Sequence, residues 1–308
     1  MDQTDLPTID FSELVSADGL KFSTPKQVQV CRDLVRAFCS TGFACLQNHG
    51  ISSEKIDSAF SKSEQFFSQD TKVKGQFTRK EGETVGWTRI GVEGFNPDRP
   101  TDLKELFNIK PEDDQPWPND TIPDFSSTML DFYQRCSTLN HQVLKAIAVG
   151  LDLADSEYLN TAHCSTSMTN LCLLHYPPIP EDIHEGQIRC GEHSDWGSIT
   201  LLFQEGGLEI QNSDGEWWAP PCIPGSILVN VGDCLQQWTT DQLKSTRHRV
   251  SLPKDDASSR SRRSMAFFSM PNNDCVIECL DGSAKYPPVV AIDYFNKKLD
   301  EIRNRGSK

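Results

Sequence analysis

The stretch that decides the fold is CGEHSDWGSITLLF, residues 190–203. It places His193 and Asp195 two positions apart, directly before an alternating, β-branched run that predicts a strand. Residues i and i+2 of a strand face the same side, so both side chains can point at one ion. Taken alone, the pair is better explained as a hydrogen-bonded histidine beside a capping aspartate. A third ligand is needed to decide between these interpretations.

A second histidine supplies that third ligand. His248 lies in STRHRVSL, on a later predicted strand. Two histidines and one carboxylate on one face leave the opposite face of a metal open, which suits non-haem Fe(II). Zinc is the rival metal, but a hydrolytic zinc site usually adds a helical H-E-x-x-H, which this sequence lacks. The pattern therefore favours iron bound by His193, Asp195 and His248.

Arg262 and Ser264 add a possible anion site after the last histidine. If residues 248–252 and 261–264 form a hairpin with Leu252 near Ser261, Arg262 lies roughly 10 Å from His248 along the ladder. An arginine at that distance can bind the far carboxylate of a five-carbon diacid whose other end chelates the metal.

Periodicity predicts a mainly β core with helices packed on it. A helix is expected to begin at Thr24 and Pro25 and to stop at Gly42, a longer one covers about 125–152, and a last one covers 291–305. From about residue 167 many short strands alternate with turns, which indicates a sandwich or jelly-roll barrel. We predict one compact α+β unit with four parts: an N-terminal region 1–122, a supporting helix and connection 123–166, a β core 167–280 and a C-terminal helix 281–308.

These motifs together resemble the Fe(II)- and 2-oxoglutarate-dependent dioxygenases of the isopenicillin N synthase-like family. The likeness rests on H-S-D (193–195), H-R-V (248–250) and R-R-S (262–264), with LPTIDF, GFACLQNHGI, LLHYPP and PGSILVNVGDCLQQWT in the family's order. It implies a distorted double-stranded β-helix in which His193, Asp195 and His248 bind iron. It also implies that the C5 carboxylate of 2-oxoglutarate is held by Tyr176, Arg262 and Ser264.

One position departs from the family. Many relatives carry Asn-x-Tyr where this chain reads Leu174-His175-Tyr176, so a side-chain donor to the metal-binding end of the cosubstrate is missing. Two alternatives therefore stay open beside the dioxygenase. One is an oxidase like isopenicillin N synthase, which needs no 2-oxoglutarate and uses the Arg-x-Ser pair for its substrate's carboxylate. The other is a catalytically silent ligand-binding scaffold.

The implied reaction is oxidation, most often hydroxylation, of a C–H bond in a small metabolite by O₂, with release of succinate and CO₂. No catalytic side chain is expected beyond the metal and cosubstrate ligands. Residues near the barrel mouth are candidates for contact with the substrate, namely Trp87, Arg89, Phe95, Phe203 and Phe268.

Composition narrows the partners. The net charge of −14, from 44 acidic and 30 basic residues, argues against nucleic acid. No apolar run approaches the roughly 20 residues of a membrane span, and the N-terminus carries no secretory signal. The odd count of 11 cysteines, without C-x-x-C, indicates a reducing compartment. We expect a cytoplasmic monomer that acts on a small molecule, without a membrane or nucleic-acid partner.

Overall fold

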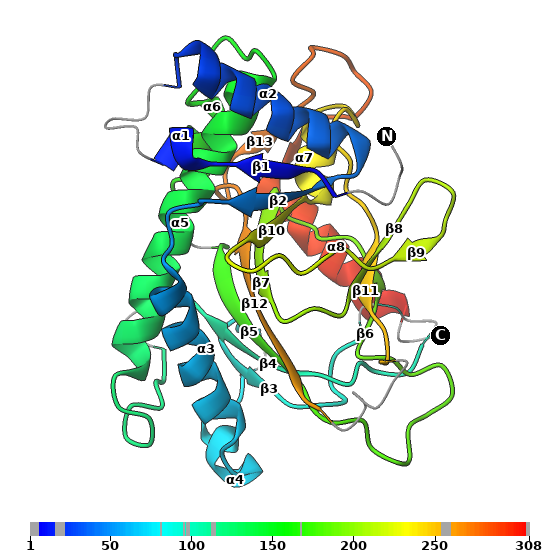
Figure 1. Ribbon diagram of the computed structural model, residues 1–308. Coiled ribbons are helices and arrows are strands. Elements are labelled where there is room, and N and C mark those ends of the chain that lie inside the picture. Colours follow the sequence, from blue (N-terminus) through cyan, green and yellow to red (C-terminus); the bar gives the residue numbers. More distant parts are fainter. Residues whose placement is uncertain are drawn as a thin grey trace.

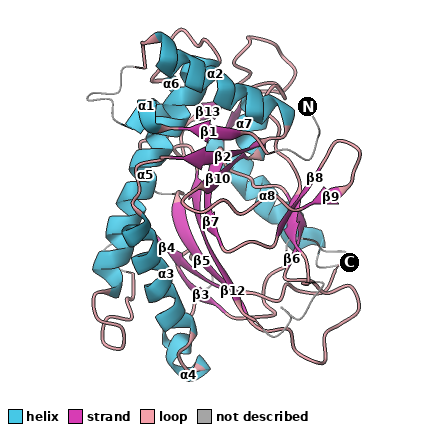
Figure 2. Ribbon diagram, viewed as in Figure 1, coloured by secondary structure: helices cyan, strands magenta, loops and turns pink. Residues whose placement is uncertain are grey.

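Two facing β-sheets of unequal size form the centre of the molecule (Figure 1, Figure 2). The larger sheet has eight strands in the order β1-β2-β10-β7-β12-β5-β4-β3, and the smaller has four in the order β6-β11-β8-β9. A short third sheet pairs β13 with β14. This computed structural model describes residues 6–15, 22–80, 82–94, 96, 99–111, 115–166, 168–253 and 260–305, with the backbone alone for 300–305.

The elements have the following bounds. The helices are α1 (Ser12–Val15), α2 (Pro25–Ser40), α3 (Ser53–Phe67), α4 (Thr71–Lys74), α5 (Phe125–Gly150), α6 (Tyr158–Thr161), α7 (Asp233–Trp238) and α8 (Ala291–Arg305), with a 3-10 turn η1 (Gly75–Phe77). The strands are β1 (Thr8–Asp10), β2 (Phe43–Gln47), β3 (Gly86–Thr88), β4 (Glu105–Ile109), β5 (Asn170–Tyr176), β6 (Cys190–His193), β7 (Ile199–Gln204), β8 (Leu208–Gln211), β9 (Trp217–Trp218), β10 (Ile227–Val231), β11 (His248–Val250), β12 (Arg262–Ser269), β13 (Val276–Ile277) and β14 (Val289–Val290).

The predicted helices form where their capping signals stand. Thr24 caps α2 by accepting from the Gln27 N–H, and the Gln27 side chain accepts from the Thr24 N–H, so two otherwise unpaired donors are satisfied. Gly42, at φ 74°, follows the end of that helix and leads into β2. The long helix predicted over 125–152 is α5, and its buried stripe packs on the large sheet.

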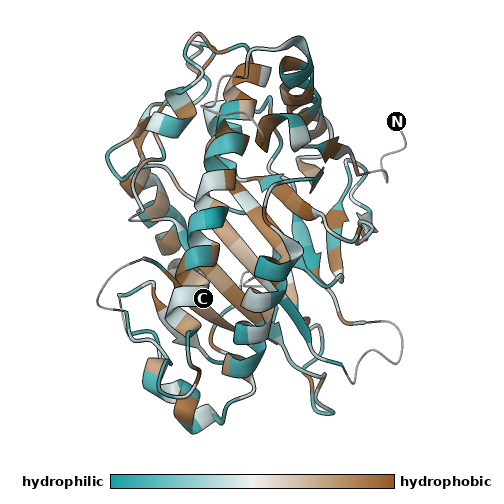
Figure 3. Ribbon diagram, turned by 60° about the vertical axis from the view of Figure 1, so that its left-hand side comes forward, coloured by the Kyte–Doolittle hydropathy of each residue, from teal (hydrophilic) through white to brown (hydrophobic). Residues whose placement is uncertain are grey.

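A helical layer covers one face of the large sheet. α5 runs along that face and packs against α2 and the strands β7 and β12 (Figure 1). The strands beneath are largely hydrophobic, whereas the covering helices carry hydrophilic residues outward (Figure 3). The Phe132 ring of α5 lies 5.0 Å from that of Phe203, and Tyr133 lies 5.1 Å from Phe267. Within the described part of the chain, no helix is long and apolar enough to cross a bilayer.

The opposite face of the large sheet looks toward the small sheet, and we call the two facing surfaces the interior faces. Because side chains alternate along a strand, Arg262, Ser264, Ala266 and Phe268 of β12 share the interior face, while Met265 and its odd-numbered neighbours face the helices. Ala266 of the large sheet is buried there in one cluster with small-sheet residues, and the half-buried Leu202 packs against this cluster. The alternation of side chains along each strand thus decides which of them face the site.

The expected hairpin of residues 248–252 with 261–264 is wrong. β11 pairs with β6 and β8 in the small sheet, whereas β12 pairs with β5 and β7 in the large sheet. The chain therefore crosses between the sheets after β11, as it does in a jelly roll, and residues 254–259 of the crossing lie outside the described part. The large sheet also draws β1 to β4 from residues before 123, so the predicted N-terminal region and β core share one sheet.

A buried ionic cluster joins β4 to the helical layer. Glu105 accepts from Lys74 Nζ at 2.8 and 2.9 Å, from Trp87 Nε1 at 2.7 Å and bonds His175 Nδ1 at 2.9 Å. Burial alone would raise the pKa of the Glu105 carboxyl, but the bonds from His175 and Lys74 and the Lys74 charge lower it below 4.5. The carboxylate is therefore charged and paired in the folded protein.

We predict that Glu105→Gln lowers the free energy of unfolding at pH 7 by about 3–5 kcal/mol, because the Lys74 charge would stay buried without its partner. Denaturant titration measures this. Asp33→Asn is the matched control, because the Asp33–Arg36 pair is exposed, and a loss under about 1 kcal/mol is expected.

The difference in the free energy of unfolding between the wild type and Glu105→Gln should depend on pH. A carboxyl whose folded-state pKa is lowered stabilises the fold fully above its ordinary value of 4.5, and the contribution is lost as the pH falls through the lower value. The gap between the wild type and Glu105→Gln should therefore narrow below about pH 4.5. An unchanged stability at pH 7 would refute the role given to this cluster.

Candidate active site

The three predicted metal ligands meet at the junction of the two sheets. His193 ends β6, Asp195 follows two residues later, and His248 begins β11 directly opposite His193 in the strand register. One donor atom from each residue lies within 4.8 Å of the others. Asp195 and His248 are buried, and His193 is nearly so. Three potential ligands thus converge in a site shielded from water.

Backbone carbonyls fix the tautomer of both imidazoles. His193 Nδ1 bonds the Gly191 carbonyl at 2.8 Å, and His248 Nδ1 bonds the Thr246 carbonyl at 3.1 Å. A carbonyl only accepts, so each Nδ1 donates and each Nε2 keeps its lone pair. Burial and the adjacent His193 lower the pKa of His248 to about 4, and burial lowers the pKa of His193. Both rings present neutral nitrogen donors.

Asp195 is held from the large sheet by two residues that the sequence analysis missed. Its Oδ2 accepts from Thr200 Oγ1 at 2.6 Å and from Asn230 Nδ2 at 2.7 Å. Its Oδ1 lies 3.8 Å from His193 Nε2 and 3.7 Å from His248 Nε2. Burial alone would raise the pKa of Asp195, but the two histidines and these bonds lower it. Two neutral imidazoles and one ionised carboxylate, each oriented by a partner, fit a divalent metal.

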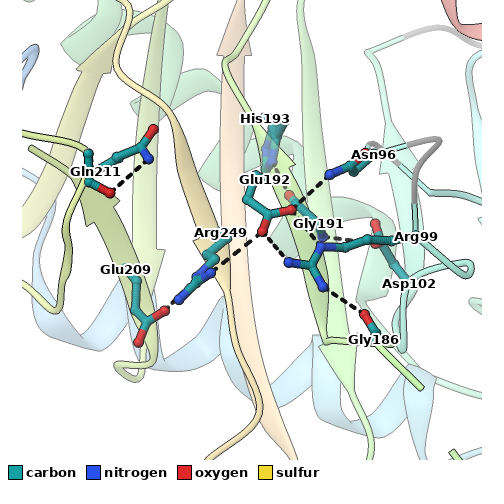
Figure 4. Close-up of polar contacts among 11 residues, drawn as sticks. Asn96, Arg99, Asp102, Gly186, Gly191, Glu192, His193, Glu209, Gln211 and Arg249 are labelled. Atoms are coloured by element: carbon teal, nitrogen blue, oxygen red, sulfur yellow. Dashed lines mark hydrogen bonds and ion pairs between the residues drawn. The ribbon is translucent and has the colours of Figure 1, made fainter. Parts of the chain in front are cut away.

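An ionic network on the outer side of the small sheet supports the strands of both histidines (Figure 4). Glu192, beside His193, accepts from Arg99 at 2.5 and 2.7 Å and lies 3.5 Å from Arg249, the neighbour of His248. Arg249 also pairs with Glu209 at 2.7 Å. The Arg99 bonds lower the pKa of Glu192 to about 2. The network ties the segment before β4 to the strands that carry the ligands.

Tyr176, Arg262 and Ser264 also come together, on the interior face of β5 and β12. Arg262 pairs with Tyr176 in the strand register, and its guanidinium lies 4.7 Å from the centre of the Tyr176 ring. Arg262 donates through Nε to the Gly206 carbonyl, through Nη1 to Ser264 Oγ at 3.3 Å and through Nη2 to Gln204 Oε1 at 3.0 Å. An arginine has five N–H donors, so among the described residues one donor on each terminal nitrogen is left without a partner.

Two further buried cations near this point escaped the sequence analysis. Arg189 donates through Nη2 to the Arg260 carbonyl at 2.8 Å, while its Nε has no hydrogen-bond partner among the described residues. Burial and the nearby Arg262 charge lower the pKa of Arg189. Lys104 bonds Asp102 at 2.7 Å and Cys190 at 3.2 Å. In sequence these residues look like ordinary surface charges, and no motif marks them.

Of the residues predicted to contact the substrate, those on strands lie on different faces of the large sheet, because side chains alternate along each strand. Phe268 lies half-buried on the interior face. Phe203 and Trp87 face the helical layer, where Phe203 meets Phe132 and the Trp87 indole donates to Glu105. Arg89 is exposed in the loop after β3, and Phe95 lies outside the described residues. The structure thus brings Phe268 to the side of the metal ligands and leaves Phe203 and Trp87 on the other side of the sheet.

Two family models match successive parts of the chain. Residues 6–125 match the model described as "non-haem dioxygenase in morphine synthesis N-terminal", and residues 166–271 match that of the "2OG-Fe(II) oxygenase superfamily". A "2-oxoglutarate-Fe(II) type oxidoreductase ppzD" of Metarhizium rileyi is 37% identical over 87% of this chain and 84% of its own. The chain belongs to the 2OG-Fe(II) oxygenase superfamily.

Other relatives agree with this membership. The "Proline hydroxylase buaE" of Petromyces alliaceus is 34% identical over 88% of this chain and 91% of its own. The solved structure of a full-length Neurospora crassa protein in complex with alpha-KG and thymine superposes with a TM-score of 0.86 at 30% identity, and the match covers 98% of both chains. The family and double-stranded β-helix fold predicted from the sequence are confirmed, as are Fe(II) and 2-oxoglutarate as the cofactors of this superfamily.

The bonds to Asp195 give a direct test of how this oxygenase holds its metal. We predict that Thr200→Val weakens Fe(II) binding by about 10- to 100-fold, because the carboxylate loses one of its two orienting donors. Anaerobic metal titration measures the affinity. Thr138→Val, the same change on the exposed side of α5, should leave it unaltered. Equal affinities in the wild type and Thr200→Val would rule out this role for Thr200.

Proposed function

We propose that this oxygenase hydroxylates a C–H bond of a small metabolite, with Fe(II) on His193, Asp195 and His248 and 2-oxoglutarate anchored by Arg262. The relatives' names support the reaction class, since they are 2-oxoglutarate-dependent oxidoreductases and hydroxylases. The convergent donor atoms of the three ligands support the metal site.

The observation that carries the cosubstrate assignment is a buried positive charge without a counter-charge. Arg262 and Arg189 are 5% and 6% exposed, and among the described residues neither has a carboxylate partner. A buried charge is costly unless it is paired. A dianion would supply the missing charge. Within the described part of the chain, Arg262 keeps one unpaired N–H on each terminal nitrogen, and these two parallel donors match the two oxygens of a carboxylate.

The distribution of roles follows from the geometry. Bound Fe(II) would supply chelation of the 2-oxo acid and activation of O₂. The chain contributes neutral imidazoles, a fixed carboxylate and the Arg262 fork on facing interior surfaces. Apolar residues between them, such as Leu174 and Ala266, limit the access of water. Leu174 stands where many members of the family carry asparagine, so the polar contacts of the cosubstrate fall mainly to its C5 end.

We further propose a free metabolite as substrate, rather than a polynucleotide or lipid, and a monomer in the cytoplasm. The net charge of −14 supports the first part. All 11 cysteines are unpaired, which agrees with a reducing compartment.

The cosubstrate anchor is tested by Arg262→Gln. We predict that the apparent KM for 2-oxoglutarate rises at least about a hundredfold, roughly 2.7 kcal/mol, because the carboxylate loses a charge-assisted pair in a buried site. Iron content should not change, since no metal ligand is touched. A succinate assay on the iron-loaded protein measures the effect.

Arg263→Gln is the matched control for this experiment. Arg263 is the adjacent residue, but it points to the other side of β12 and pairs with Glu64 and Glu205. Its replacement should leave the KM for 2-oxoglutarate unchanged. If 2-oxoglutarate neither binds at millimolar concentration nor stimulates O₂ uptake, the cosubstrate-independent oxidase is the correct alternative.

A further inference from the structure

A polar strip crosses the interior face of β3, β4 and β5, beside the proposed metal site. It consists of Thr88, Asn108 and Asn170, one residue from each strand, and none of them binds the metal or the proposed C5 anchor. We propose that this strip binds a secondary amide of the substrate, with Asn170 accepting its N–H and Asn108 donating to its carbonyl. The proposal rests on the function proposed above and names the chemical class of its substrate.

The strand register sets the strip close to the metal ligands. Asn170 pairs with Phe268, and Phe268 pairs in turn with Thr200, whose hydroxyl bonds Asp195. Neighbouring strands lie about 4.8 Å apart, so Asn170 is roughly 10 Å across the sheet from Thr200. Asn108 pairs with Cys172, two residues along β5 from Asn170 on the same face. A small molecule beside Phe268 can therefore lie between the strip and the metal.

The two asparagines leave a matched donor and acceptor. Asn170 Nδ2 donates to Asn108 Oδ1 at 2.9 Å. Among the described residues, Asn170 Oδ1 and Asn108 Nδ2 have no further partner. Both side chains are half-buried, so they remain within reach of a ligand. One acceptor and one donor on adjacent side chains complement the N–H and C=O of one secondary amide.

Thr88 supplies an independent sign that a polar ligand belongs here. Its hydroxyl is buried without a hydrogen-bond partner in the described part of the chain, and the residue is only 5% exposed. Thr88 pairs with Leu106, two residues before Asn108 on the interior face of β4. Buried polar groups are nearly always hydrogen-bonded, and unpaired ones point to a missing ligand or water. The apolar side chains of Leu106 and Leu174 flank the strip. In such surroundings a ligand without an amide would leave the polar atoms of the strip without hydrogen bonds, so its binding would be disfavoured.

Paired model ligands test the proposal by binding alone. The protein is loaded anaerobically with Mn(II) and 2-oxoglutarate, and calorimetry compares each N–H compound with its N-methyl derivative. One pair is cyclo(Ala-Ala) and its N,N′-dimethyl form, and the other is thymine and 1,3-dimethylthymine. Preference within the first pair indicates a peptide-type substrate, and preference within the second indicates a pyrimidine.

We expect the wild type to bind at least one N–H compound about tenfold more tightly than its N-methyl partner, a difference of about 1.4 kcal/mol. Asn170→Leu and Asn108→Leu should each bring that ratio close to one, with metal and 2-oxoglutarate affinity retained. Asn296→Leu, the same change at an exposed position of α8, should keep the preference.

Two results would overturn the amide site. One is wild-type protein that binds neither pair at millimolar concentration or shows no N–H preference in either. The other is a preference that survives both asparagine replacements. Failure of the proposed function looks different, since Mn(II)-loaded protein would then not bind 2-oxoglutarate, while the N–H preference can still be measured with metal alone.

Discussion

The site depends on one shared carboxylate. Asp195 lies two residues after His193, which ends β6 of the small sheet, yet its Oδ2 is fixed by Thr200 and Asn230 of the large sheet. These bonds turn Oδ1 toward both histidine Nε2 atoms. Because the carboxylate is buried, any shift of one sheet against the other would leave a charged group without partners. The bonds that position the metal ligand thus also link the two sheets, beside the apolar cluster that the sheets share.

The proposed cosubstrate site is positively charged although the protein as a whole is negatively charged. The chain carries a net charge of −14, but the interior end of β12 gathers Arg262 and Arg189 without a carboxylate partner among the described residues. In a low-dielectric interior such charges act strongly on a nearby anion. An acidic exterior with a local cationic interior favours a small dianion over a polyanion. The polar strip of Thr88, Asn108 and Asn170 adds neutral donors and acceptors beyond it.

Features that depend only on residues close together in the sequence were predicted correctly. The cap at Thr24, the stripe of α5 and the H-S-D motif require only neighbours in sequence, and each was found where expected. The predictions that were wrong concern features that depend on pairing between strands far apart in the sequence. The hairpin from 248 to 264 was wrong because the chain changes sheets there, a choice made by packing rather than by turn residues. The facing of Phe203 and the roles of Arg189 and Asn230 likewise follow from register, which a single sequence does not reveal.

The most direct test counts iron. Metal-free wild type, His193→Ala and Asp195→Ala are equilibrated anaerobically with Fe(II), and bound iron per chain is measured beside circular dichroism. We predict one Fe(II) per wild-type chain, none in either variant, and a retained fold, because the apolar cluster around Ala266 still holds the two sheets together when one metal ligand is removed. Normal iron content and full turnover in both variants would contradict the account.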